Sequence, residues 1–147
     1  MRWRRALAIA AVAGAACHGD PPPVPRAVGT VVVEPPLDPA TVATELRGRR
    51  IAERVIDQAG LARTADQLVR LVRTRAVPGS RLVEVAVAVA PARDGAPPLD
   101  ARGAVFVCNQ WLDQAVAQEL EQTAAPAEDL PRRLPVRVLD ACRLRGR

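Results

Sequence analysis

The chain has 147 residues, enough for one domain with a hydrophobic core plus short terminal segments. Its net charge is +5, yet three of its 21 basic residues lie in the first five positions and three in the last five, which leaves 15 against 16 acidic residues between them. Aromatic residues make up 2% of the chain. A near-neutral middle without a basic stripe or aromatic stacking platform excludes an ordinary nucleic-acid-binding domain, so we expect no nucleic-acid partner.

The N-terminus has the pattern of an export signal. Three arginines precede the uncharged run 6–16, which is shorter than the ~20 apolar residues that span a membrane and fits a signal peptide. In the first interpretation, residues 1–16 are a bacterial lipoprotein signal and Cys17 carries the lipid. In the second, cleavage after Ala15 releases a secreted chain. We expect a protein anchored to a membrane of the cell envelope and facing the periplasm, or, in the second case, a soluble periplasmic one.

Residues 17–26 are predicted to be a tether between the anchor and the domain. The prolines of 20–25 disfavour helix and favour an extended polyproline conformation, which is stiff and does not pack. The domain itself is expected over 27–142, followed by a solvated basic tail over 143–147.

The first half of the domain predicts a strand and two helices. A β-rich run covers 28–33, and Asp38 before a proline is a helix start, with helix expected over 41–59. The apolar spacing slips at Gly48, which indicates a kink or boundary there. Gly60 has the character of a C-terminal cap. A capping box at 64–67 then predicts a short helix that carries Leu68, Leu71 and Val72.

The second half predicts strand, helix and strand. Alternation over 82–90 places four valines on a core face and mostly alanines on the other, where they suit close packing or a subunit contact. Asp100 is expected to cap a helix that runs to about 123. A final strand is expected over 134–141, with Val136, Val138, Asp140 and Cys142 sharing one face.

The predicted order is therefore strand, helix, helix, strand, helix, strand. This order indicates an α+β fold, with a small mixed β-sheet and helices packed on one face. Cys108 lies on the inward stripe of the long helix, and Cys142 lies on the face of the last strand that would meet it. The two are a candidate disulfide in an oxidising compartment; two separate buried thiols are the alternative.

The inventory of reactive side chains disfavours an enzyme. The single histidine, His18, lies in the tether, the single serine, Ser80, lies in a turn, and there is no lysine. Cys108 and Cys142 lack the spacing of a zinc site. Asp113, Glu119 and Glu121 are interpreted as the solvated face of a helix. We therefore expect no catalytic residue, no metal site and no cofactor.

Four segments, in order, carry a resemblance to a known family. The stretch 45–61 resembles the first helix of the polysaccharide chain-length determinant (Wzz-type) family, with Gly48 at a serine position and Ala59 at a leucine position. The stretch 77–85 resembles the strand that follows in the family. The segment 104–112, with Cys108-Asn109, is similar to its Ala-Asn helix, and 136–141 is similar to its closing strand.

The resemblance implies a membrane-proximal α/β module of the periplasmic domain type, which self-associates or docks beside polysaccharide assembly and export proteins. The chain departs from the family in having a short signal instead of a first transmembrane helix, and in lacking the second helix and the long helical extension. The resemblance and these departures together suggest a non-catalytic accessory of O-antigen, capsule or exopolysaccharide biosynthesis or export, anchored through Cys17. A generic periplasmic lipoprotein that acts as a protein-interaction module is the alternative.

Overall fold

The computed structural model describes residues 22–122 and 135–146. Four strands and four helices follow one another along these residues. They are β1 (Arg26–Val33), α1 (Pro39–Glu45), α2 (Arg49–Ala59), α3 (Ala65–Val69), β2 (Val72–Ala76), β3 (Leu82–Ala88), α4 (Ala101–Gln122) and β4 (Val136–Arg145).

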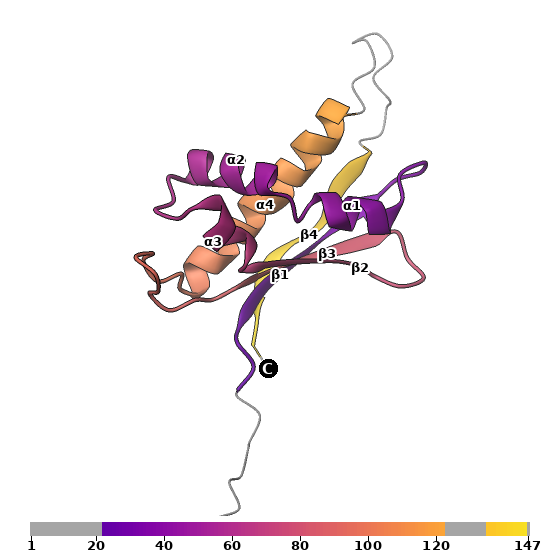
Figure 1. Ribbon diagram of the computed structural model, residues 1–147. Coiled ribbons are helices and arrows are strands. Elements are labelled where there is room, and N and C mark those ends of the chain that lie inside the picture. The colour runs from indigo at the N-terminus through magenta and orange to yellow at the C-terminus, as the bar shows by residue number, and fades with distance from the viewer. Residues whose placement is uncertain (1–21, 123–134, 147) are drawn as a thin grey trace, which may run out of the picture.

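The strands form one antiparallel sheet in the order β2-β3-β1-β4, so the first and last strands of the chain are neighbours. The helices gather on one face of this sheet, with α4 packed along β1, β3 and β4 and α1 near β2 and β3 (Figure 1). The opposite face is bare of helices in the part of the chain that the structure describes. The predicted α+β class, with helices on one sheet face, is thus confirmed, whereas the sheet predicted to be mixed is antiparallel in all three described pairs.

Local sequence signals explain where the helices begin and end. The Asp38 carboxylate accepts a hydrogen bond from the Thr41 amide at 2.9 Å and caps α1. Gly60 ends α2 in the left-handed conformation, at φ 61°. The capping box predicted at Thr64 and Gln67 is present at the start of α3. At Gly48 the chain does more than kink, because α1 ends before it and α2 begins after it.

Three differences from the predicted elements concern the sheet. Residues 72–76 form the edge strand β2, which pairs with β3 from Val72 opposite Val87 to Ala76 opposite Val83. Val72 was predicted on the short helix, and no strand was predicted here. Strand β4 also runs on to Arg145, so residues 143–145 of the predicted tail belong to the sheet, although they are exposed. Strand β1 likewise begins at Arg26, within the predicted tether.

The pairing of β4 with β1 contains two irregularities that matter for the cysteines. The register shifts between Thr30 and Val31 and again between Val28 and Thr30, so β4 has two extra residues. Asp140 therefore faces outward with Thr30, contrary to plain alternation, whereas Cys142 faces the core. Cys142 is bonded to Cys108 of α4, which joins the last strand to the helix layer.

Close packing around this bond explains a glycine in the neighbouring strand. A Cβ on Gly29 would lie 2.6 Å from the Cys142 sulfur and 2.8 Å from Leu112. The Asn109 side chain accepts a hydrogen bond from the Cys142 amide at 2.9 Å, so α4 also holds β4 through its irregular backbone. Gly29 is thus the place where strand, helix and disulfide approach most closely.

The core lies between the helices and the sheet. Trp111 of α4 is fully buried at its centre, and its indole nitrogen donates to the Leu46 carbonyl at 2.8 Å. That carbonyl lies at the end of α1, where helical partners run out, so the tryptophan satisfies a group that would otherwise be buried unpaired.

Several expectations fall outside the described residues: the signal peptide 1–16, the lipidation site Cys17, and His18. The prolines ahead of residue 22 belong with them. Among residues 22–122 and 135–146, no helix combines the length and apolar character needed to cross a bilayer.

Candidate functional site on the open sheet face

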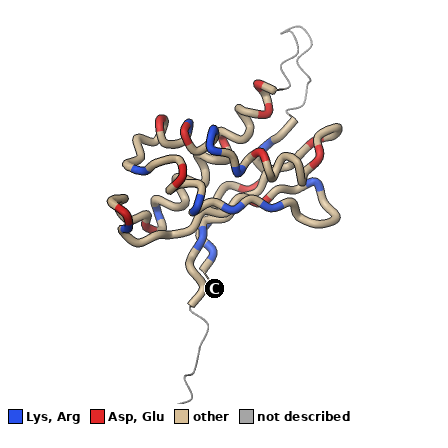
Figure 2. Tube along the Cα trace, in the orientation of Figure 1, with Lys and Arg blue, Asp and Glu red and all other residues tan. Residues whose placement is uncertain are grey.

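The bare face of the sheet carries an excess of arginine. In antiparallel pairs, residues directly opposite each other point to the same side, so the register identifies this face. Most of the charged side chains of this face come from the two edge strands β2 and β4, while β1 contributes Arg26 and β3 contributes Glu84 beside Ala86 and Ala88 (Figure 2). Within the described residues, this outer face has six arginines and two acidic side chains: Arg26, Arg73, Arg75, Arg137, Arg143, Arg145, Glu84 and Asp140.

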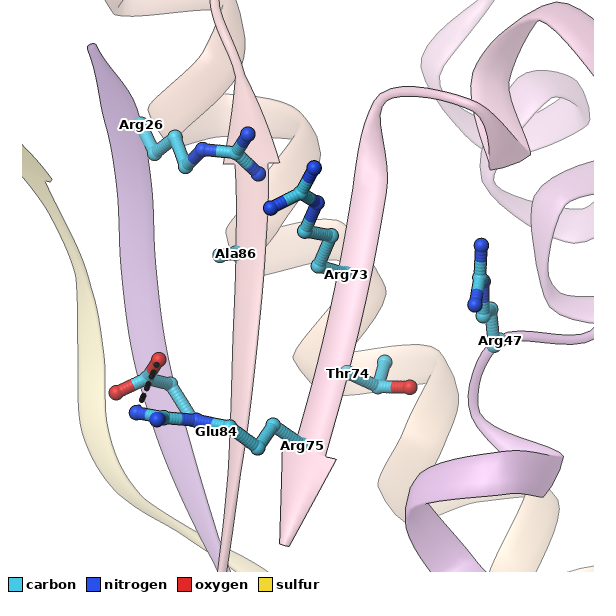
Figure 3. A pocket seen from close by; sticks show the side chains of 7 residues that line it. All are labelled: Arg26, Arg47, Arg73, Thr74, Arg75, Glu84 and Ala86. Atoms are coloured by element: carbon cyan, nitrogen blue, oxygen red, sulfur yellow. Dashed lines mark hydrogen bonds and ion pairs between the residues drawn. The ribbon is translucent and has the colours of Figure 1, made fainter. Parts of the chain in front are cut away.

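Two of these arginines converge over an alanine. Arg26 of β1 and Arg73 of β2 reach toward each other across β3, above Ala86 (Figure 3). The pKa of Arg26 is lowered from its ordinary value, first by burial and second by the positive charge of the nearby Arg73 guanidinium. Two like charges are therefore held near each other, and an anion placed between them would relieve their repulsion.

These side chains line an open cavity of about 460 Å³ on the sheet surface. Its floor is Ala86, which lacks the bulk to fill the space between the arginines. Arg47, from the link between α1 and α2, lies at the far rim beside β2, and Arg75 closes the other end. The cavity is wide, solvated and positively charged, which suits an anionic headgroup or polymer and not a buried small molecule.

The arginines at the other end of the face are neutralised. Arg75 pairs with Glu84 at 3.2 Å, and Arg137 pairs with Glu34 at 3.5 Å. Asp140 accepts a hydrogen bond from the Thr30 hydroxyl nearby. By contrast, no described acidic residue forms an ion pair with the four arginines at the end where β1 begins: Arg26, Arg73, Arg143 and Arg145. The free positive charge is thus concentrated at one end of the strands.

A second cavity, of about 320 Å³, adjoins this end and shares Arg26. Its wall combines apolar and charged side chains, because Val24, Leu71 and Val89 lie there together with Arg63, Arg70, Arg93 and the acidic Asp94. Arg63 is already occupied by a hydrogen bond to the Pro97 carbonyl. The surface around the start of β1 is therefore both basic and partly apolar.

The acidic residues of α4 behave differently from one another. Glu121 is exposed, and its hydrogen bond to Arg54 at 2.7 Å lowers its pKa. Glu119 is only 1% exposed; burial, then its hydrogen bond to Glu45 and that group's charge, raise its pKa to about 7. Interpreting Glu119 as part of a solvated face was wrong, because it points into the contact between α4 and the end of α1. Asp113 is exposed, as predicted.

The other residues singled out from the sequence have structural roles here. Ser80 shapes a turn, since its hydroxyl donates to the Val77 carbonyl and accepts from the Leu82 amide. Cys108 and Cys142 are bonded to each other. Across residues 22–122 and 135–146, histidine, cysteine and acidic side chains nowhere gather in threes that would hold a metal ion.

The arginine face was missed from the sequence because charge was counted along the chain and not across strands. Thr74 separates Arg73 from Arg75, and Leu144 separates Arg143 from Arg145. In both pairs the arginines are two positions apart, which is the period of side chains on one face of a strand. That spacing was the available signal. It was hidden because the first pair follows the predicted short helix, in residues for which no element was predicted, and the second pair lies in the predicted basic tail.

Comparisons of the chain with models of protein families, with curated proteins and with solved structures give no match.

Proposed function

We propose that this protein is a non-catalytic accessory of surface polysaccharide biosynthesis or export, anchored to a membrane through a lipid on Cys17, and that it acts by binding through its open sheet face. The observation that carries the proposal is the bare arginine-bearing face opposite the helix layer. A surface of this kind binds anions and does not activate a nucleophile. The polysaccharide context rests on the ordered resemblance of four segments to the chain-length determinant family.

A deletion strain tests the cellular role. We expect loss of the gene to change the amount or the length distribution of surface polysaccharide, and wild-type complementation to restore it. A variant with Arg26→Gln and Arg73→Gln should fail to restore the pattern. A matched control removes equal charge from the helix layer, with Arg49→Gln and Arg50→Gln. An unaltered polysaccharide profile in the deletion strain would refute the proposed role.

Mass spectrometry of the mature protein tests the anchor separately. An N-terminal Cys17 that carries a diacylglyceryl group is the expected result. A chain that begins with a free Ala16 would show ordinary secretion and rule out the lipid anchor, without bearing on what the sheet face binds.

A protein-interaction module is the second candidate, and the edge strand β4 favours it. Within the described residues β4 pairs only with β1, and its other edge is open. Val138 and Leu139 are 38% and 48% exposed beside that edge. An open edge with apolar side chains is a common site for addition of a partner's strand. Replacing Leu139 by Lys would abolish partner capture in this case, and would leave a function based on Arg26 and Arg73 intact.

A further inference from the structure

We propose that the end of the sheet where β1 begins docks directly onto anionic lipid headgroups, so that the protein lies with this end against the membrane surface. The inference deepens the proposed function and rests on it in one respect, the location of the lipid at Cys17. The docking surface is defined here by the four unpaired arginines Arg26, Arg73, Arg143 and Arg145, and we call it the basic end.

The first argument is the distribution of charge along the strands. If the arginines served only solubility, we would expect their ion pairs to be spread evenly over the sheet face. Instead, Arg75 and Arg137 at one end have acidic partners at 3.2 and 3.5 Å, whereas the basic end has none among the described residues. The unneutralised positive charge of the sheet face therefore lies at the start of β1.

The second argument is where the chain enters. Arg26 follows Cys17 by nine residues, which span at most about 30 Å when fully extended. Arg26 lies directly opposite Arg145, so the entry of β1 and the end of β4 are side by side (Figure 1). Figure 2 shows basic residues at this same pole of the molecule. A lipid on Cys17 would therefore hold the basic end within about 30 Å of the headgroups.

The third argument is that apolar side chains are exposed around the basic end. Val24 is 54% exposed just before β1. Leu144 is 46% exposed at the same end of the sheet, although it lies opposite the buried Ala27 and therefore on the helix side, not on the arginine face. Phe106 of α4 is 49% exposed. Phe106 and Leu144 are each two residues from a cysteine of the disulfide that fixes α4 on β4. Cations beside exposed apolar side chains are the combination that binds the interface of an anionic bilayer.

An acidic polysaccharide is the competing occupant, since it offers the same negative charge. It explains the arginines, but it does not account for the apolar side chains or for the position of the tether. The lipid surface accounts for all three observations, and the experiment below separates the two ligands.

The test uses the chain from His18 to Arg147 without a lipid, so that binding reports the surface and not the anchor. This chain keeps the whole hydrophobic core, which runs from Ala27 to Cys142. Sedimentation is measured with vesicles of phosphatidylglycerol mixed with phosphatidylcholine, and with vesicles of phosphatidylcholine alone. We expect binding to the anionic vesicles only, and weakening as salt is raised.

Replacing Arg26 and Arg73 by Gln should lower the partition onto anionic vesicles about 10- to 30-fold, because two basic contacts are lost. The control variant, Arg49→Gln with Arg50→Gln, has the same net charge and should bind as the wild type does. Far-ultraviolet circular dichroism and the absence of free thiols check that each variant is folded.

Three results would overturn the inference: equal binding to both kinds of vesicle, an equal loss in the control variant, or binding of soluble polygalacturonate through Arg26 and Arg73 without binding to the anionic vesicles. The last of these would assign the face to an acidic polymer instead. If the cellular protein proved to carry no lipid at Cys17, the proposed anchor would be wrong. The vesicle experiment would still test lipid binding by the basic end, because it uses a chain without a lipid.

Discussion

Glu119 gives the sharpest stability prediction, because a buried acid makes stability depend on pH in a defined direction. Its pKa is raised from 4.5 to about 7, first by burial and then by its hydrogen bond to Glu45 and the charge there. Between these two values the folded chain retains a proton that the unfolded chain releases. Stability is therefore fully present below about pH 4.5 and falls as the pH rises to about 7.

The size of the effect follows from the shift. Each pKa unit corresponds to about 1.4 kcal/mol, so the full shift sets a ceiling of about 3 kcal/mol. Glu45 is exposed at the end of α1 and can move toward solvent, which reduces the cost. We therefore expect Glu119→Gln, which keeps the shape and removes the titration, to stabilise the protein by about 1–3 kcal/mol at pH 8 and to leave stability at pH 4.5 nearly unchanged.

Urea unfolding, followed by circular dichroism at several values between pH 4.5 and pH 8, measures this difference. Glu121→Gln is the control of opposite sign. Glu121 has a lowered pKa through Arg54, so its charge stabilises the fold at neutral pH, and the variant should be slightly less stable there. Parallel pH profiles of wild type and Glu119→Gln would refute the reasoning, because they would mean that Glu119 is ionised in the folded protein at little cost.

Three further predictions concern the packing of α4 on the sheet. Replacing both Cys108 and Cys142 by Ser should cost about 3–4 kcal/mol in urea unfolding, since the bond closes a loop with a separation of 34 residues; a loss below 1 kcal/mol would contradict this. Gly29→Ala should cost about 1–3 kcal/mol, because the added carbon would lie 2.6 Å from the Cys142 sulfur. Gly146→Ala is its control, with its nearest contact at an ordinary 3.6 Å. Trp111→Phe should cost about 2 kcal/mol in the same assay by leaving the last carbonyl of α1 buried without its donor, and an unchanged midpoint would show that water replaces it.

The elements with strong local signals were predictable from the sequence. Asp38 and the capping box at Thr64 define helix starts by hydrogen bonds between residues three positions apart, which depend on nothing distant. The alternation of β3 and the apolar stripe of α4 are also local. The α+β class and the meeting of Cys108 with Cys142 follow from these features. Plain alternation predicts the correct side for Cys142 only because the two extra residues of β4 restore the original alternation before that residue.

The edge strands were harder to predict because their structure depends on distant partners. Val72 to Ala76 has no run of β-branched residues, and it is a strand because β3 supplies its hydrogen bonds. Arg143 and Arg145 have the composition of a solvated tail, and they join the sheet by pairing with β1, more than 100 residues earlier. Since both unpredicted strand segments carry arginines, the same tertiary pairing that was missed also hid the candidate site.

Strand β3 shows why the binding face and the core can be built from one segment. Its valines at 83, 85 and 87 face the helices and are fully buried, while Ala86 faces the arginines. A larger residue at Ala86 would fill the space over which Arg26 and Arg73 converge. A second protein layer without acidic side chains on this face would leave those two charges buried without partners, at a large cost in free energy. The small outer face of β3, which the sequence predicts to suit close packing or a subunit contact, forms with Ala86 the floor of the arginine-lined cavity.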